Sequence, residues 1–381
     1  MPHNVEQVLV EGVTRPGYEA VRTAFAENLA SGQELGAHFA VYRDGEALVD
    51  LWGGRMARDL AHPIEQHSVY TIFSATKGIV AMCFALLVER GTISYDEPVA
   101  TYWPEFASHG KGELTVGELL SHQGGLPTTR IPATIEDYYA HDGVAAALAG
   151  QEPYFRPGVW SYHPVSFAAL TDELIRRTDG RTFRQFYAEE LAAQAAGDMF
   201  LGLPEVEDMR HVGMEKSPAP SSVTFDPPLP AMFERAMSNP KSDLDWPNQR
   251  RFRAEGLPHA GASGNARGLA KLYAALVTSH TPLLSPAVYE QATRERIAGI
   301  DQGSGGIGRY AAGFRLNVGN MGANPAAFGH PGLGGTMGFA DPARGLGVAY
   351  TTNRALNPNW EQVDPRLLKL LVAFYVAEAA N

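Results

Sequence analysis

A serine and a lysine stand three residues apart at the start of the apolar stretch "FSATKGIVAMCFALLVERG", which runs from Phe73 to Gly91. On a helix, residues three apart lie on the same face. Ser74 would sit at the N-terminal end, where free backbone N–H groups favour developing negative charge. Lys77 would sit one turn further on, where apolar surroundings lower a lysine pKa. A neutral amine there accepts the serine proton, so the pattern predicts an activated nucleophile.

The spacing Ser-x-x-Lys occurs three times in this chain, so context must separate the occurrences. Ser108 and Lys111 lie in the polar, glycine-containing loop "SHGKG", and the pair at 238 and 241 encloses Pro240. The Ser74 pair alone opens a long apolar helix. From this stretch by itself the alternative stays open: an N-cap serine, followed by a lysine whose stem covers apolar surface.

Two further motifs follow in order along the chain. Tyr162 comes after a Pro-Gly turn and just before a helical pattern, in "FRPGVWSYHPVSFAAL". The triplet His330-Pro331-Gly332 stands at the expected entry of a strand, in "FGHPGLGGTMGFADP". With the flanking "LTVGELLSHQGGLP", "GNARGLAKLYAAL" and "GLGVAYTTNR", this set resembles the penicillin-recognising serine hydrolases over about residues 15–355. That family includes class C β-lactamases, DD-peptidases and family VIII carboxylesterases, and the flanking motifs look like the last of these.

The resemblance implies a role for each motif residue. Ser74 would be the nucleophile, Lys77 its general base or electrostatic partner, and Tyr162 would pass a proton between nucleophile and leaving group. The backbone N–H groups of Ser74 and Leu333 would form the oxyanion hole. The plainer alternative for Tyr162 is a half-buried structural tyrosine.

Four residues are expected to bind substrate on the same grounds: His330, Gly332, His163 and Gln123. Gly332 would let the strand approach the substrate carbonyl closely, because it has no side chain. His330 has the alternative of a strand-end histidine without a function. We expect no metal site and no cofactor.

The sequence departs from the penicillin-binding pattern at two prolines. The second motif is usually Tyr-x-Asn, but this chain has Pro164 at the amide position; the third usually has a central hydroxyl residue, but this chain has Pro331. Those lost groups would hold the amide and carboxylate of a β-lactam or peptide. Their loss predicts ester substrates, which need an oxyanion hole and a pocket.

The elements that must position these residues follow from hydrophobic periodicity and turn signals. Helical spacing predicts helices at 18–33, from Ser74 to Gly91, at 264–277 and at 364–379. Strand patterns flank Asp44-Gly45, which predicts a hairpin, and return in "YAAGFRLNV", "GTMGFADP" and "LGVAYTTN", with a second hairpin turn at 341–345. We therefore expect an α/β (α+β) serine β-lactamase-like fold. It has an antiparallel sheet flanked by helices, built from residues 1–73 and 264–381, and a mainly helical second lobe at 74–263. The stretch 217–230 carries five prolines and predicts a surface loop or lid.

Composition restricts the possible partners. The formal net charge is -11, which argues against nucleic acid as the main partner. Cys83 is the single cysteine, so no internal disulfide can form, and we expect it in the core. No apolar run approaches the roughly 18 residues of a membrane span, and no secretory signal opens the chain, so we expect a cytoplasmic protein with a small-molecule ester substrate. "GSGGIG" at 303–308 is not followed by a helix, which argues against a dinucleotide fingerprint.

Four functions remain in competition at this level. The leading one is a carboxylesterase that hydrolyses short-chain acyl esters through an acyl-enzyme. The others are an acyltransferase of the same fold, a β-lactamase or D-amino peptidase, and a non-catalytic ligand-binding module. The natural substrate, the acyl acceptor and the oligomeric state stay open.

Overall fold

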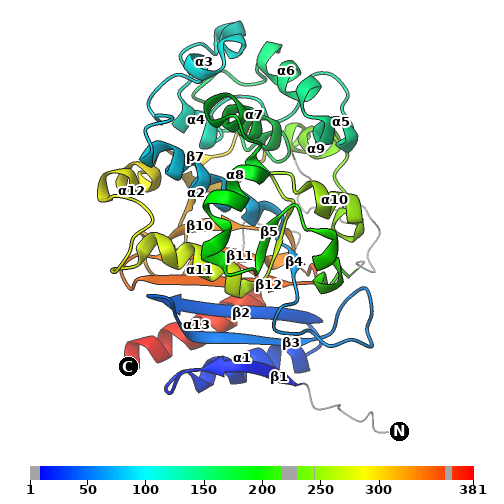
Figure 1. Ribbon diagram of the computed structural model, residues 1–381, viewed down its shortest axis with the longest axis vertical. Coiled ribbons are helices and arrows are strands. Elements are labelled where there is room, and N and C mark those ends of the chain that lie inside the picture. The colour runs from blue at the N-terminus through cyan, green and yellow to red at the C-terminus, as the bar shows by residue number, and fades with distance from the viewer. Residues whose placement is uncertain (1–8, 216–229, 244, 357–362) are drawn as a thin grey trace.

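The computed structural model describes residues 9–215, 230–243, 245–356 and 363–381. Figure 1 shows a sheet with α1 and α13 at one end of the molecule and a group of helices at the other, with α2 between them. The proline-rich stretch predicted as a loop or lid lies, except for Pro230, outside the described residues.

The main sheet has nine strands in the order β1-β3-β2-β12-β11-β10-β9-β8-β7, and every neighbouring pair is antiparallel. A second sheet has the order β4-β6-β5. The strands are β1 Val10–Thr14, β2 Gly36–Arg43, β3 Glu46–Gly54, β4 Tyr70–Thr71, β5 Met199–Leu201, β6 Ala262–Gly264, β7 Ile297–Ile300, β8 Ile307–Tyr310, β9 Arg315–Leu316, β10 Phe328–Pro331, β11 Met337–Asp341 and β12 Leu346–Thr352.

Both predicted hairpins are confirmed. Asp44 and Gly45 join β2 to β3 with positive φ at both residues, 48° and 82°, as the tight turn requires. Residues 342–345 join β11 to β12. Strands β2 and β12 pair with each other, so the first and last parts of the chain share one sheet.

The helices cover both faces of this sheet and form the second lobe. They are α1 Glu19–Ala30, α2 Thr76–Glu89, α3 Val99–Tyr102, α4 Val116–Leu120, α5 Ile135–Ala140, α6 Asp142–Gly150, α7 Phe167–Asp179, α8 Phe183–Glu190, α9 Ala231–Ser238, α10 Arg250–Glu255, α11 Ala266–Val277, α12 Pro286–Thr293 and α13 Pro365–Ala380. None of the helices in the described part of the chain has the length and apolarity needed to cross a membrane.

Alternation along β2 shows how the sheet is sandwiched. Phe39 and Val41 pack in one core cluster with α1 and α13, whereas Ala40 and Tyr42 pack in another with α2 and α11. A period of two puts successive side chains on opposite faces. The expected fold is confirmed: an antiparallel sheet flanked by helices, plus a mainly helical lobe. The division at 73/74 and 263/264 stays a prediction.

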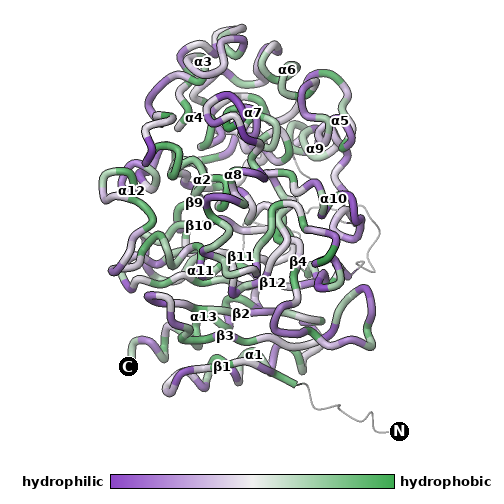
Figure 2. The backbone as a smooth tube through the Cα atoms, viewed as in Figure 1, coloured by the Kyte–Doolittle hydropathy of each residue, from purple (hydrophilic) through white to green (hydrophobic). Residues whose placement is uncertain are grey.

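Helix α2 is the centre of the larger core. Every residue from Thr76 to Leu87 is buried, and Figure 2 shows much of this helix as hydrophobic. A helix that is apolar on all sides belongs inside a protein. Cys83 is buried within it, as expected.

Two strand predictions were wrong in detail. The run 310–318 is not one strand, because residues 311–314 turn back: Gly313 has φ 88° and the Ala311 N–H donates to Phe314 O at 2.9 Å. His330 and Pro331 close β10 and do not open a strand. The strand stops there because the Gly332 N–H donates to Thr336 O at 2.7 Å and closes a turn into β11.

Candidate active site

Ser74 lies in a short 3-10 turn, Phe73–Ala75, between β4 and the first residue of α2. Phe73 has φ 48°, in the left-handed region, which costs a non-glycine residue about 1–3 kcal/mol. Phe73 and Ala75 are buried, but Ser74 between them is partly exposed. The strained turn thus presents one hydroxyl at the surface of an otherwise buried segment.

Lys77 is completely buried and its amine contacts three oxygens. Nζ lies 3.3 Å from Ser74 Oγ, 3.0 Å from Pro164 O and 2.9 Å from His259 O. No carboxylate pairs with this amine among the described residues. Burial lowers its pKa well below the ordinary lysine value. In its neutral form the amine has two N–H bonds and one lone pair, so the two carbonyls can take the N–H bonds while the lone pair faces the serine hydroxyl.

Tyr162 lies beside both the amine and the serine. Its ring centroid is 5.0 Å from Lys77 Nζ, and its hydroxyl is hydrogen-bonded to the Ser74 hydroxyl. Burial, and then the neighbouring Tyr310, raise the pKa of Tyr162, so it stays a neutral phenol. Its backbone N–H donates to Asp301 Oδ1 at 3.3 Å. The structure therefore brings together the three residues predicted from the first two motifs.

The third motif, His330-Pro331-Gly332, lies at the end of β10 and packs beside the Ser74 turn. A Cβ atom added to Gly332 would lie 2.2 Å from Ile72 O and 3.3 Å from Ala75 N, so this backbone packs against the Ser74 turn. Glycine is required by this close approach. The His330 ring stacks near Tyr162 with centroids 6.3 Å apart.

His330 is a neutral histidine with one nitrogen engaged. Its Nδ1 lies 2.7 Å from Pro331 O and therefore carries the proton, which leaves Nε2 as an acceptor. Nε2 is buried and has no hydrogen-bond partner among the described residues. Burial, and then the nearby Lys77, hold the pKa of His330 well below 6.5.

The backbone donors near Ser74 differ in their availability. Gly332 N–H is engaged with Thr336 O, and Pro331 has no N–H. Within the described residues, no hydrogen bond uses the N–H of Ser74 or of Leu333, the first residue of the 3-10 turn Leu333–Gly335. One of these N–H groups belongs to the serine itself, and the other follows Gly332, whose backbone packs against the Ser74 turn.

His163 and Gln123, which were predicted to bind substrate, are buried and hydrogen-bonded to other residues of the protein. The buried His163 ring contacts His122 Nδ1 through its own Nδ1 at 3.2 Å, and its Nε2 accepts from the Leu126 N–H at 3.0 Å. Burial lowers its pKa to about 3, so it is neutral and both nitrogens are used. Gln123 Nε2 donates to Ser121 Oγ at 2.7 Å. This geometry favours support of the Tyr162 segment over contact with substrate.

Several site groups were missed by sequence reasoning. The carbonyls of Pro164 and His259 have no sequence signal, because every residue carries one. Asp301 stands before the glycine-rich run at 303–306, and its Oδ1 accepts from the N–H groups of Tyr162 and Gly303. His122 packs against Tyr162 with ring centroids 4.6 Å apart, and it belongs to the "LLSHQGGLP" stretch that carried the resemblance.

Comparison with known proteins identifies the family of this chain. Residues 21–373 match the family described as Beta-lactamase. The Esterase/beta-lactamase LipL of Mycobacterium tuberculosis is 30% identical over 366 residues, covering 92% of this chain and 84% of that protein. A solved family VIII carboxylesterase is 36% identical with a TM-score of 0.88, over 97% of this chain and 100% of the other. A penicillin-binding protein homologue from Caulobacter crescentus is 36% identical with a TM-score of 0.85, over the same shares of the two chains. The family match spans nearly the whole chain and the fold is shared throughout, so this protein belongs to the Beta-lactamase family and has its serine hydrolase fold.

Proposed function

We propose that this protein is a serine carboxylesterase that hydrolyses short-chain acyl esters through an acyl-enzyme on Ser74. The observation that carries the proposal is the environment of Lys77: a buried amine that contacts two backbone carbonyls and the serine hydroxyl and has no carboxylate partner among the described residues. The carboxylesterase among the solved structures and the esterase among the curated relatives support the ester class.

In acylation, Lys77 Nζ takes the proton of Ser74 Oγ as the oxygen attacks the ester carbonyl carbon. The carbonyl π bond breaks and a tetrahedral oxyanion forms. When this intermediate collapses, the bond from carbon to the alcohol oxygen breaks. Tyr162 gives its phenolic proton to that oxygen and recovers a proton from the Lys77 ammonium group, so the alcohol leaves neutral.

The N–H groups of Ser74 and Leu333 hold the oxyanion. They are supported in this role because both are unengaged and the β10 end packs against the Ser74 turn. Donors that are fixed before the reaction stabilise developing charge without reorganisation. In deacylation, water replaces the alcohol and the same proton transfers run in reverse, which releases the acid.

The remaining predicted residues take different parts in this proposal. His330 Nε2 accepts a hydrogen bond from the leaving alcohol or the incoming water, because an ester itself has no donor, and Gly332 allows the carbonyl to approach. His163 and Gln123 are positioning residues: His163 fixes His122 against Tyr162, and Gln123 fixes the Ser121 turn.

A labelling experiment tests the nucleophile and the reaction together. A fluorophosphonate should add once to the protein, and peptide mapping by mass spectrometry should place the adduct on Ser74. p-Nitrophenyl esters of graded chain length should be turned over fastest when the acyl chain is short. An adduct elsewhere, or turnover that depends on an added alcohol acceptor, would favour another nucleophile or the acyltransferase alternative.

Preference for esters over β-lactams is a separate expectation. Pro164 and Pro331 supply no side-chain polar groups where the family pattern has an amide and a hydroxyl, and each missing hydrogen bond costs about 1–3 kcal/mol. Two such losses correspond to roughly a hundredfold lower kcat/KM, since about 1.4 kcal/mol is tenfold. p-Nitrophenyl butyrate and a chromogenic cephalosporin should be compared on one preparation. Equal efficiencies would contradict the expectation, and Pro331→Thr should raise the cephalosporin-to-ester ratio.

A further inference from the structure

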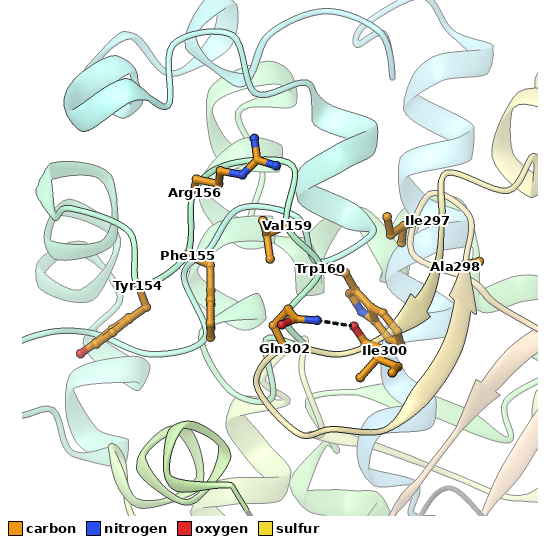
Figure 3. Close-up of a pocket in the computed structure, with 9 residues that line it drawn as sticks. All are labelled: Tyr154, Phe155, Arg156, Val159, Trp160, Ile297, Ala298, Ile300 and Gln302. Atoms are coloured by element: carbon orange, nitrogen blue, oxygen red, sulfur yellow. Dashed lines mark hydrogen bonds between the residues drawn. The ribbon is translucent and has the colours of Figure 1, made fainter.

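A cavity of 540 Å³ lies beside the proposed active site, between the segment 154–160 and the β7 strand with the residues that follow it (Figure 3). Its size is within the range of small-molecule sites. Phe155, Val159, Ile297 and Ile300 give it apolar walls, with Trp160 between the two sides. None of the residues placed in the mechanism above lines it.

Two segments that line the cavity also contact Tyr162. Trp160 stands two residues before Tyr162 in the sequence. It packs in one cluster with Tyr162 and Tyr310. The Gln302 N–H donates to Trp160 O at 3.0 Å, and the adjacent Asp301 accepts from the Tyr162 N–H. The same two segments therefore shape the cavity and hold the tyrosine.

The side on which the cavity lies decides which part of an ester it would receive. In the mechanism proposed above, Tyr162 protonates the oxygen of the leaving alcohol, so that alcohol must point to the tyrosine side of Ser74. Trp160, which lines the cavity, packs in one cluster with Tyr162, so the cavity lies on the tyrosine side of the site. An acyl chain departs from the carbonyl carbon in another direction.

The polar groups of the cavity indicate the chemistry of that arm. Trp160 Nε1 is buried and has no hydrogen-bond partner in the described part of the chain. Figure 3 shows Arg156 at the edge of the group of lining residues, with its guanidinium above Val159 in this view. Tyr154, also in the wall, lies under Arg130 and Arg235, at 4.4 and 5.4 Å from the ring centroid. Arg130 pairs with Glu152 at 3.8 Å, but neither Arg156 nor Arg235 forms an ion pair with another described residue.

Arg156 is thus the charged side chain among the lining residues, on a protein whose net charge is -11. We infer that the cavity binds the alcohol arm of the substrate, and that this arm is apolar along its length and anionic at its far end. The inference rests on the proposed function for the direction of the leaving group. It names a substrate class: short-chain acyl esters of an aryl or alkyl alcohol that carries a carboxylate or similar group.

The first test varies the size of the alcohol arm at constant acyl group. Acid release from 2-phenylethyl acetate and ethyl acetate is followed by pH-stat titration. Ala298 is exposed on β7 and lines the cavity, so Ala298→Trp fills it. The ratio of kcat/KM for phenylethyl over ethyl ester should fall at least about fivefold, as expected for an excluded apolar group. Ala343→Trp, on the exposed turn between β11 and β12, is the matched control and should leave the ratio unchanged. An unchanged ratio in Ala298→Trp would overturn the inference.

The second test isolates the charge. 4-(2-Acetoxyethyl)benzoate matches 2-phenylethyl acetate except for a distant carboxylate, so the two leaving alcohols are equally basic. Arg156→Gln should raise KM for the carboxylate ester about threefold relative to the neutral ester, as for one exposed ion pair. Roughly 0.5 M salt should reduce the wild-type preference in the same direction. Arg15→Gln is the control, because Arg15 pairs with Glu46 on the far end of the sheet. Equal effects on both esters would overturn the anionic part of the inference.

A binding measurement separates failure of this inference from failure of the proposed function. Ser74→Ala is titrated with 4-(2-hydroxyethyl)benzoate, the product alcohol, by ligand-observed NMR. Binding that is weakened by adding Ala298→Trp supports the cavity even if no ester is hydrolysed. Binding that Ala298→Trp does not weaken overturns the inference whatever the esterase activity.

Discussion

Two Ser-x-x-Lys pairs in this protein have nearly the same internal geometry, and only one has the surroundings of an active site. Lys77 Nζ is 3.3 Å from Ser74 Oγ, and Lys111 Nζ is 3.4 Å from Ser108 Oγ. Both lysines are buried and both contact two backbone carbonyls. The distance between nucleophile and base therefore does not distinguish them.

The surroundings of the two serines differ in three ways. Ser108 Oγ already donates to Ala149 O at 2.7 Å, so its proton ties the 104–110 turn to α6. The ring near Lys111 is Phe106, at 5.5 Å, which has no hydroxyl to pass a proton. Ser74 instead contacts Tyr162, and the Gly332 backbone, which precedes Leu333, packs against its turn. A Ser-Lys pair becomes a candidate site when a proton relay and free backbone donors converge on it.

The largest expected effect is on the two serines. Ser74→Ala should reduce kcat for p-nitrophenyl butyrate by roughly a thousandfold or more, as removal of a nucleophile does. Ser108→Ala should leave kcat within about twofold, since surface changes outside a site are small. Steady-state kinetics on both variants, with circular dichroism to check folding, show which serine is the nucleophile. A large loss in Ser108→Ala with intact folding would reverse the assignment.

The two lysines should respond differently to replacement by arginine. Lys77→Arg should cost about a hundredfold or more in kcat, because guanidinium does not deprotonate and a general base contributes that much. Lys111→Arg keeps a charge and donors for Ser108 O and Gln151 O, so activity should persist. Pre-steady-state measurement of the acylation rate checks this. An active Lys77→Arg enzyme would show that positive charge alone is needed.

Removal of the phenol tests the proton relay. Tyr162→Phe should lower kcat by about a hundredfold and affect KM less, as for a lost general acid. Tyr95→Phe is the matched control: Tyr95 is also fully buried, its hydroxyl has no hydrogen-bond partner among the described residues, and it is not in the site. Near wild-type activity in Tyr162→Phe would make that tyrosine structural.

The smallest expected effect is on the free energy of unfolding when either lysine is replaced by methionine. The pH dependence of this effect should differ between Lys77 and Lys111. Burial lowers the pKa of Lys111 to about 8 and that of Lys77 well below its ordinary value of 10.5. Between the lowered and the ordinary pKa the unfolded chain binds more protons than the folded protein, so the free energy of unfolding rises with pH. Methionine at either position removes this dependence.

The Tm difference between Lys77→Met and wild type should therefore shrink as pH rises from 7 to 10. For Lys111→Met it should change only above about pH 8, because below that both states are protonated. Differential scanning calorimetry across this range gives both curves. A flat difference for Lys77→Met between pH 7 and 8 would mean that Lys77 is charged in the resting protein.

Much of the fold could be predicted because it is encoded in local patterns. The Asp44-Gly45 turn, the strand pattern of β12 and the apolar run after Ser74 each predict a structure from a few neighbouring residues. The β8–β9 break was missed because residues 310–318 read as one apolar strand, whereas Gly313 allows a tight turn that pairs Tyr310 with Arg315. His330 was assigned to the wrong end of a strand for a similar reason: pairing partners on both sides, not local pattern, set where β10 ends.

The sequence by itself determined the side chains of the candidate site: Ser74, Lys77 and Tyr162 were identified from residue type, spacing and resemblance. Only the tertiary structure decided which backbone groups join them. The carbonyls of Pro164 and His259, which accept from the buried amine, and the N–H of Leu333, which no hydrogen bond between described residues uses, are groups that nearly every residue carries. Their role depends on position in space, where segments 87 and 182 residues from the lysine converge. The cavity beside Trp160 likewise exists only because residues 154–160 and 297–302 meet, and no local pattern specifies a meeting of segments so far apart.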